Sequence, residues 1–442
     1  MRLGNALSAV RGVNAQDMRA EVNSSWLSNG MRVTTMKLPW AKSVCIGVWF
    51  KVGSAHDGEN ELGMAHFVEH LLFKGTKRHT GKKIAQVVDE LGAYLEAFTE
   101  RELTCYYARV LPEGVSKMLK LMAELVTEPA ICARDIKIEQ DVVLSEITEV
   151  NDDPEELVQE LLLEALWDAH PLARPVLGKP ETVKSFTAKS VKSFLKRFYT
   201  PDNAVVTASG CLEHERFVEE LQEAFGSFNG KAQTLRITPP IPKPHPKVVE
   251  KKAAQAHVCI GSHGFSQRQR KQFLCMILLD LILGGNASSR LFQTIRERLG
   301  LAYSIGSMSV GMRDAGFLAI SFSCLPENVG KVAVMLKREL QKLLRGGVKQ
   351  SELERAKMQL RSSMIMSLES VMGQMLQMGR QLVYFDKLVP NEEVLASLNS
   401  ITIEDVMETA FKLFGHGKLA VSIVSTLDAQ SAEKVVQTLT EI

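Results

Sequence analysis

The sequence predicts an α+β protein of two homologous domains, each a mostly antiparallel sheet packed with helices and joined by a proline-rich linker. Three observations predict this fold class. Short runs of alternating apolar residues, typical of strands, are interspersed with longer runs of helical periodicity. Two short segments recur at one fixed spacing, and a proline-rich stretch separates the two copies. Hydrophobic residues make up 45% of the 442 and charged residues 24%, which is typical of a globular chain long enough for two domains.

The first domain contains alternating patterns early and helical patterns later. The alternation of apolar residues over 44–52 predicts a half-buried strand. The other elements that we expect are a helix over residues 82–91, a strand pair over residues 95–110, and helices over residues 115–126, 135–150 and 154–167.

The internal repeat consists of two matches at one spacing. The segment Val-Cys-Ile-Gly at residues 44–47 recurs at residues 258–261. The segment Leu-Pro-Glu-Gly-Val at residues 111–115 recurs as Leu-Pro-Glu-Asn-Val at residues 325–329. Both shifts, from 44 to 258 and from 111 to 325, are 214 residues. An identical offset for two matches predicts a duplicated domain of about 210 residues.

The linker between the two copies is marked by five prolines within residues 238–246. Proline lacks a backbone N–H, so this stretch is expected to be an extended connector rather than helix or sheet. The predicted organisation is a first domain over residues 20–235, a linker over residues 236–246, and a sister domain over residues 247–442.

Composition excludes several classes of function. A net charge of +2 gives no reason to expect nucleic acid as a partner. No stretch approaches the ~20 apolar residues of a membrane span. The seven cysteines are scattered, so neither a disulfide framework nor a cysteine zinc site is expected. The N-terminal stretch has no continuous apolar core, so we expect no secretory signal and a cytoplasmic protein rather than one of the mitochondrial matrix.

A candidate metal site lies in the pattern His-x-x-Glu-His formed by His66, Glu69 and His70. Residues four apart share a helix face, so both imidazoles can reach one metal ion. Zinc held by three protein groups keeps a position open for water, and Glu69 is close enough to take a proton from it. The alternative is a surface helix that carries two histidines by chance.

The repeat offers a test of the metal hypothesis. A shift of 214 places Asp280, Leu283 and Gly284 opposite the three motif residues. The second copy therefore has the architecture without the metal-binding residues, which favours a functional role for the motif in the first copy.

The third ligand is expected to be a carboxylate on the helix predicted over residues 135–150. Glu139, Glu146 and Glu149 are the candidates, and the first two are seven apart and so share a face. A solvated acidic stripe is the alternative. His56 and His79 lie in sequence typical of loops and are weaker candidates.

The stretch over residues 63–76 resembles the signature of the inverzincins, the pitrilysin and insulin-degrading-enzyme family, and is most similar to the branch that includes the mitochondrial processing peptidase. The resemblance implies one Zn²⁺ per chain, held by His66, His70 and Glu146. It also implies Glu69 as the catalytic base and Glu139 as a glutamate that assists activity.

Two further stretches carry the resemblance. Residues 284–292, with those that follow to residue 304, resemble the family's second-domain signature, which implies that Arg296 and Tyr303 bind substrate. From residue type alone, these two would be a surface charge and a strand or core residue. The resemblance also implies substrate pairing along an edge strand containing Ala97, Phe98 and Thr99. Here Glu96 departs from the family's usual asparagine.

The expected function is that of a zinc endopeptidase that hydrolyses peptides or unfolded polypeptides, bound as an extended strand in an enclosed chamber. The resemblance implies that two chains enclose this chamber, and heterodimeric members of the branch divide the two motifs between an active and an inactive subunit. Because this chain carries both motifs, we expect a homodimer. Two alternatives are a processing peptidase that removes targeting sequences and a non-catalytic scaffold subunit of the same fold. Such scaffold subunits typically lose motif residues, and this chain retains the whole zinc set.

Overall fold

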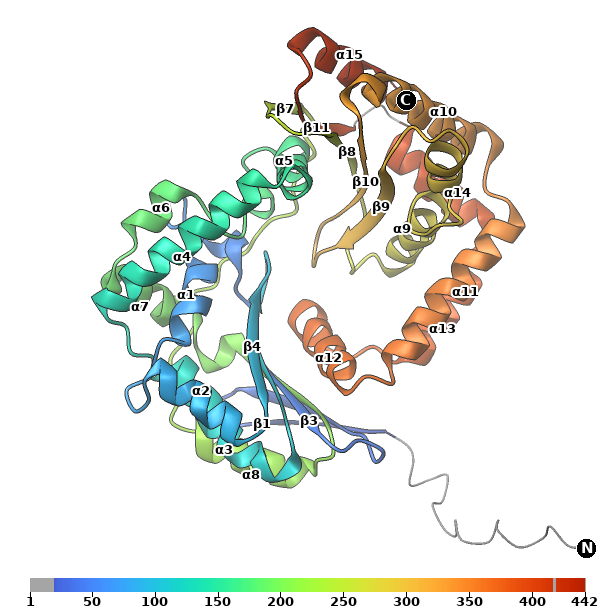
Figure 1. Cartoon of the computed structure of the whole chain (residues 1–442). Helices are drawn as coiled ribbons and strands as arrows, with labels where there is room; N and C mark the ends of the chain where they lie inside the picture. Colours follow the sequence, from blue (N-terminus) through green and yellow to red (C-terminus); the bar gives the residue numbers. More distant parts are fainter. Residues whose placement is uncertain (1–19, 416–418, 442) are drawn as a thin grey trace, which may run out of the picture.

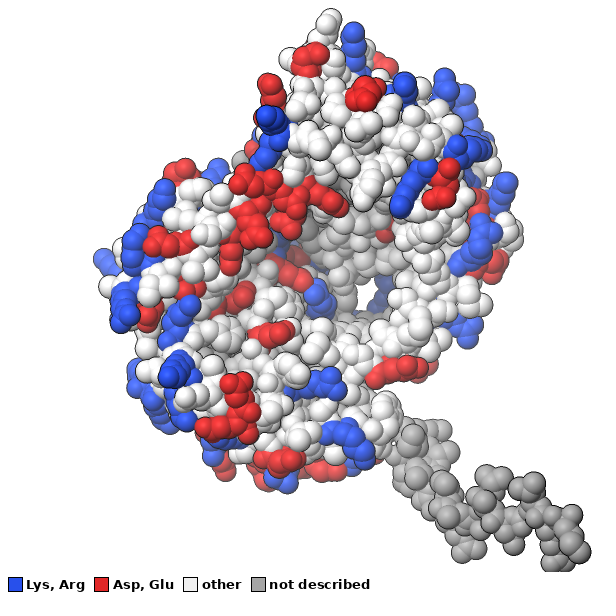
Figure 2. Space-filling model, in the orientation of Figure 1, with Lys and Arg blue, Asp and Glu red and all other residues white. Residues whose placement is uncertain are grey.

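The computed structural model of the chain describes residues 20–415 and 419–441. It consists of two sheets with their helices, which face each other across a central space (Figure 1). Side chains leave a hollow there, as Figure 2 shows. The elements from β1 to α8 are called the first half and those from β7 to α15 the second half. The N-terminal stretch, on which the expectation of no secretory signal rests, lies outside the described residues.

The first sheet has six strands in the order β1-β2-β6-β3-β5-β4, antiparallel except for β2 with β6. Its strands are β1 (Glu21–Trp26), β2 (Arg32–Lys37), β3 (Val44–Phe50), β4 (Tyr94–Thr99), β5 (Thr104–Val110) and β6 (Ala204–Gly210). The helices of the first half are α1 (Met64–Leu72), α2 (Gly81–Glu90), α3 (Val115–Thr127), α4 (Ala133–Asp152), α5 (Pro154–Trp167), α6 (Pro180–Ser185), α7 (Ala188–Phe198) and α8 (His214–Phe225), with short helices η1 (Ser54–His56), η2 (Pro112–Gly114), η3 (Pro171–Ala173) and η4 (Pro201–Asn203).

The second sheet has five strands in the order β7-β11-β8-β10-β9, antiparallel except for β7 with β11. Its strands are β7 (Pro246–Glu250), β8 (Ala256–His263), β9 (Ser304–Gly311), β10 (Gly316–Cys324) and β11 (Ala420–Ser425). The helices of the second half are α9 (Arg270–Leu283), α10 (Val329–Gly346), α11 (Gln350–Ser367), α12 (Val371–Phe385), α13 (Asn391–Ser400), α14 (Ile403–Phe414) and α15 (Ala429–Thr440), with short helices η5 (Phe292–Arg298) and η6 (Pro326–Asn328).

The two sheets share one topology. The order β2-β6-β3-β5-β4 matches β7-β11-β8-β10-β9, and the single parallel pair stands at the same place in each. The repeated segments at residues 44–47 and 258–261 lie on the equivalent strands β3 and β8. The predicted fold class of two related α+β units is therefore confirmed. The limits given for the domains and linker stay a prediction.

Each half covers one face of the other half's sheet with a helix. Helix α12 packs on β3 and β6 of the first sheet, where Met375 and Leu382 are fully buried. Helix α5 packs on β8 and β11 of the second sheet, where Leu162 is buried and Ser422 donates to the carbonyl of Val158 at 2.7 Å. These equivalent helices are thus exchanged between the halves, which ties the halves together.

The expectation of a half-buried strand over residues 44–52 is wrong, because every residue of β3 is buried. Its alternating residues Val44, Ile46 and Val48 face the core of the first half, as the pattern predicts. The residues between them face α12, which approaches so closely that a Cβ on Gly47 would lie 2.5 Å from Sδ of Met375. Burial on the second face comes from the exchanged helix, which the strand's own sequence does not encode.

Most other element predictions are confirmed. The expected strand pair corresponds to β4 and β5, and the four expected helices are α2 to α5, with ends within two residues. All seven cysteines are free, as expected. Among the described residues no helix is long and apolar enough to cross a membrane.

Candidate metal centre and active site

Helix α1 carries the His-x-x-Glu-His motif, and its sequence fixes how it starts. The carboxylate of Asp57 accepts the backbone N–H groups of Gly63 and Ala65 at 2.8 and 3.1 Å. Gly63 has φ of +91°, and a Cβ there would lie 2.5 Å from the carbonyl oxygen of Leu177, so only glycine fits. The apolar residues of the helix are buried, which leaves the motif side chains on its half-buried face.

His66, His70 and Glu146 converge at this face, from α1 and the neighbouring helix α4. One ligand atom from each lies within 4.8 Å of the others. Nε2 of His66 is 3.9 Å from Oε2 of Glu146, and Nε2 of His70 is 3.7 Å from Oε1. Glu149 is exposed and does not join the group. Of the three carboxylates left open by the sequence, only Glu146 meets both histidines.

The chemistry of this cluster fits a divalent metal ion. Oε2 of Glu146 and Nδ1 of His66 are buried and have no hydrogen-bond partner. Leaving a carboxylate oxygen buried and unpaired is costly, and a cation would remove the cost. Burial, and then the neighbouring His70, lower the pKa of His66 to about 3, so its imidazole is neutral and can bind a metal. Two imidazoles and one carboxylate are a ligand set that leaves one coordination position open.

Glu139 lies on the other side of His70. Its Oε2 is 3.2 Å from Nδ1 of His70, and its Oε1 is 2.5 Å from Nζ of Lys74. The side chain is 1% exposed, which leaves no room for contact with a substrate. A carboxylate in this position orients the imidazole and raises its basicity as a ligand. The resemblance indicated Glu139 as a glutamate that assists activity, but not that it contacts His70. Nothing in the sequence indicated Lys74.

Glu69 is held beside the cluster by the end of the edge strand β4. Oγ1 of Thr99 donates to Oε2 of Glu69 at 2.6 Å. Burial raises the pKa of Glu69, while this hydrogen bond and His70 oppose the rise. The sequence named Thr99 only as a substrate-pairing residue, and no signal in the sequence indicated that its hydroxyl contacts Glu69.

Comparison with known proteins agrees with this geometry. The family described as "Insulinase (Peptidase family M16)" matches residues 32–180, and "Peptidase M16 inactive domain" matches residues 185–360. The chain is 33% identical over 386 residues to the "Uncharacterized zinc protease YmxG" of Bacillus subtilis, covering 87% of this chain and 94% of the relative. It is 36% identical over 396 residues to the "Uncharacterized zinc protease Rv2782c" of Mycobacterium tuberculosis, covering 87% and 89%. The chain belongs to the peptidase M16 family.

Solved structures show the same fold. An M16 inactive-domain protein of Pseudomonas fluorescens has a TM-score of 0.86 at 22% identity, covering 92% of this chain and 99% of its own. A protease of Helicobacter pylori has a TM-score of 0.84 at 22% identity, covering 92% and 100%. The family matches and the relatives above confirm the resemblance to the inverzincins that the motifs indicated, and the solved structures add the shared fold.

In this M16 chain the strand β4 forms the free edge of the first sheet. Ala97 and Phe98 stand just before Thr99, and Phe98 packs edge-to-face on Trp49 with ring centroids 5.9 Å apart. Glu96 is exposed and accepts a hydrogen bond from the hydroxyl of Tyr107. Within the described residues the outer backbone groups of β4 have no strand partner, so the edge is open to a further strand.

The resemblance also implied two substrate-binding residues in the second half, Arg296 and Tyr303. Arg296, on η5, is exposed, and its guanidinium stands 4.7 Å from the ring centroid of Phe292. Tyr303, just before β9, is 73% exposed. Neither makes a hydrogen bond or ion pair with His66, His70 or Glu146 among the described residues. A role of either residue in substrate binding stays a prediction.

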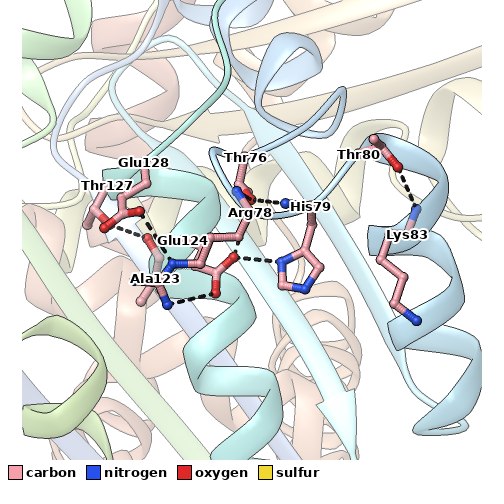
Figure 3. A network of polar contacts seen from close by, with 9 residues as sticks. All are labelled: Thr76, Arg78, His79, Thr80, Lys83, Ala123, Glu124, Thr127 and Glu128. Carbon is pink, nitrogen blue, oxygen red and sulfur yellow. Dashed lines mark hydrogen bonds and ion pairs between the residues drawn. The ribbon is translucent and has the colours of Figure 1, made fainter.

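A separate polar network fixes the loop that follows α1 (Figure 3). Glu124 on α3 lies 2.7 Å from Nδ1 of His79 and accepts from the hydroxyl of Thr76 at 3.2 Å, and Arg78 approaches the same carboxylate. The hydroxyl of Thr76 in turn accepts the backbone N–H groups of Arg78 and His79. His79 is therefore engaged with Glu124 and does not belong to the metal cluster.

Proposed function

We propose that this chain is a zinc-dependent endopeptidase that hydrolyses peptides or unfolded polypeptides. The observation that carries the proposal is the convergence of His66, His70 and Glu146 beside the carboxylate of Glu69. The names of the M16 relatives as zinc proteases support it.

His66, His70 and Glu146 would hold one zinc ion per chain. When bound, the ion supplies a Lewis acid for the substrate carbonyl and lowers the pKa of a coordinated water to about 7. Glu69 takes the proton of the attacking water and returns it to the departing amine. Burial supports this role, because it raises the pKa of Glu69 toward the range of a general acid and base.

The substrate would bind as an extended strand along β4. Backbone groups of Ala97, Phe98 and Thr99 would pair with it, so main-chain contacts dominate and sequence preference is loose. Arg296 and Tyr303 would donate to a substrate carbonyl as negative charge develops there. Since neither side chain bonds to the cluster within the described residues, we propose that a second copy supplies them in a homodimer enclosing a chamber. A cytoplasmic location stays a prediction.

The direct test joins metal analysis to digestion of a library of unstructured peptides. Purified protein is expected to contain about one zinc per chain, to lose cleavage on removal of the metal, and to regain it with Zn²⁺. Cleavage confined to targeting-type sequences would identify a processing peptidase. Zinc-loaded protein that cleaves no member of the library would contradict the proposal and favour a scaffold.

A further inference from the structure

Helix α12 is fixed on the first sheet by close backbone packing (Figure 1). A Cβ on Gly379 would lie 2.0 Å from the indole of Trp49, so the helix backbone rests directly on this β3 side chain. Thr207 and Ser209 of β6 donate their hydroxyls to the carbonyls of Met375 and Val371 at 3.2 and 2.6 Å. The side chain next to Gly379 therefore has a well-defined position relative to the first sheet.

That next residue is Arg380, which reaches the turn between β4 and β5. Its Nη1 and Nη2 donate to the two carboxylate oxygens of Glu100 at 2.9 and 2.6 Å. A bidentate pair of this kind fixes orientation as well as distance. The guanidinium also stands 5.7 Å from the ring centroid of Phe98 on β4. An arginine of the second half thus holds the end of the strand that borders the candidate active site.

Three further hydrogen bonds involve the same turn. The backbone N–H of Glu100 donates to the carbonyl of Leu103 at 2.8 Å, and the carbonyl of Glu100 accepts from the N–H of Ser54 at 3.1 Å. The carboxylate of Glu102 accepts the N–H of Arg313, from the loop between β9 and β10, at 2.8 Å. The second half therefore contacts this turn from α12 and from the second sheet.

Thr99 directly precedes Glu100, and its hydroxyl is the donor to Glu69 at 2.6 Å. A shift of the turn moves Thr99, and with it the only side-chain hydrogen bond that Glu69 makes among the described residues. We propose that Arg380 is a positioning residue that holds the carboxylate of Glu69 in place through Glu100 and Thr99. This inference rests on the proposed peptidase function, and it means that the exchanged helix α12 is part of the catalytic apparatus of the first half.

The test compares Arg380→Gln, Arg380→Lys, Thr99→Val and the double variant Thr99→Val/Arg380→Gln on one unstructured fluorogenic peptide that the wild type cleaves. Arg380→Gln is expected to lower kcat about ten- to a hundredfold with KM nearly unchanged, because misplacing a catalytic group costs rate rather than binding. Arg380→Lys keeps the charge without the bidentate contact, so its kcat should lie between those of the wild type and Arg380→Gln. In the Thr99→Val background, Arg380→Gln should lower kcat less than about twofold further, because the route to Glu69 is already broken.

Two measurements separate positioning from general stability. Hydrogen exchange of the Glu100 and Ser54 amides, which donate to Leu103 and Glu100 respectively, should speed up in Arg380→Gln, while zinc content stays that of the wild type. Arg270→Gln is the matched control, because Arg270 pairs with Glu393 wholly within the second half at similar exposure. It should leave kcat unchanged. If Arg380→Gln does not fold, Glu100→Gln removes the same pair from the turn and should give the same pattern.

Two results would overturn the inference while leaving the peptidase function intact. One is a wild-type kcat in Arg380→Gln, and the other is an equal loss of kcat from Arg380→Gln in the wild-type and Thr99→Val backgrounds. A zinc-loaded wild type that cleaves no peptide would instead overturn the proposed function and this inference with it.

Discussion

Glu139 and Glu146 contact opposite nitrogens of His70. Glu139 lies 3.2 Å from Nδ1, and Glu146 lies 3.7 Å from Nε2. A hydrogen bond donated by Nδ1 to Glu139 would orient the ring and leave Nε2 free for a metal ion. The other oxygen of the buried Glu139 carboxylate pairs with Nζ of Lys74 at 2.5 Å.

Glu139→Gln should therefore weaken zinc binding by about 10- to 100-fold, because the amide replaces a charged acceptor behind His70. Competition with a chelator of known affinity measures this. The matched control is Glu124→Gln, which removes a similar carboxylate from Nδ1 of His79 away from the cluster. It should leave zinc affinity unchanged. Equal zinc affinity in Glu139→Gln and the wild type would show that the contact does not support the site.

A pH dependence of stability follows from Glu102. Burial raises the pKa of this carboxyl to about 7, while the hydrogen bond from the N–H of Arg313 opposes the rise. The folded state therefore binds a proton more tightly than the unfolded state. The contribution of the Glu102 carboxyl to stability is present below about pH 4.5 and is lost as pH rises to about 7. The free energy of unfolding changes by about 3 kcal/mol over this range.

The Glu102→Gln side chain cannot titrate, so the variant should lack this part of the dependence of stability on pH. The free energy of unfolding of the wild type minus that of the variant should fall as pH rises from 4.5 to 7.5. Urea denaturation of both proteins at several pH values measures the difference. A difference that is flat or rises with pH would contradict the raised pKa.

The proposed homodimer, in which a second copy supplies Arg296 and Tyr303, predicts complementation between subunits. Glu69→Gln and Arg296→Gln should each be nearly inactive alone. Mixed dimers would place an intact Glu69 opposite an intact Arg296 at one of their two sites, so random reassortment should restore roughly a quarter of wild-type activity. Reassorted dimers without recovered activity would show that the two motifs act within one chain or not at all.

The sequence predicted the elements that local pattern encodes. Helical spacing placed His66 and His70 on one face of α1, and the repeat predicted two related sheets. The pattern alone did not decide which of Glu139, Glu146 and Glu149 is the third ligand. Which carboxylate lies near the histidines depends on how the neighbouring helix packs, and a local pattern does not encode that packing. The structure gives Glu146 to the cluster and Glu139 to the far side of His70.

What the sequence did not predict depends on contacts between distant segments. Amphipathic patterns show that α5 and α12 have apolar faces, but they do not show that each helix covers the other half's sheet. For the same reason β3 was expected to be half-buried. The hydrogen bond from Thr99 to Glu69 and the pair of Glu100 with Arg380 join residues 30 and 280 positions apart, and no local pattern indicates them.

The measurement that tests the central claim most directly is made on Glu69→Gln. Zinc content and cleavage of an unstructured peptide are determined on the same preparation, beside the wild type. Because Glu69 is placed as the proton carrier and not as a ligand, the variant should hold as much zinc as the wild type and lose at least about 100-fold in kcat. A variant that cleaves the peptide at the wild-type rate with normal zinc content would contradict the mechanism.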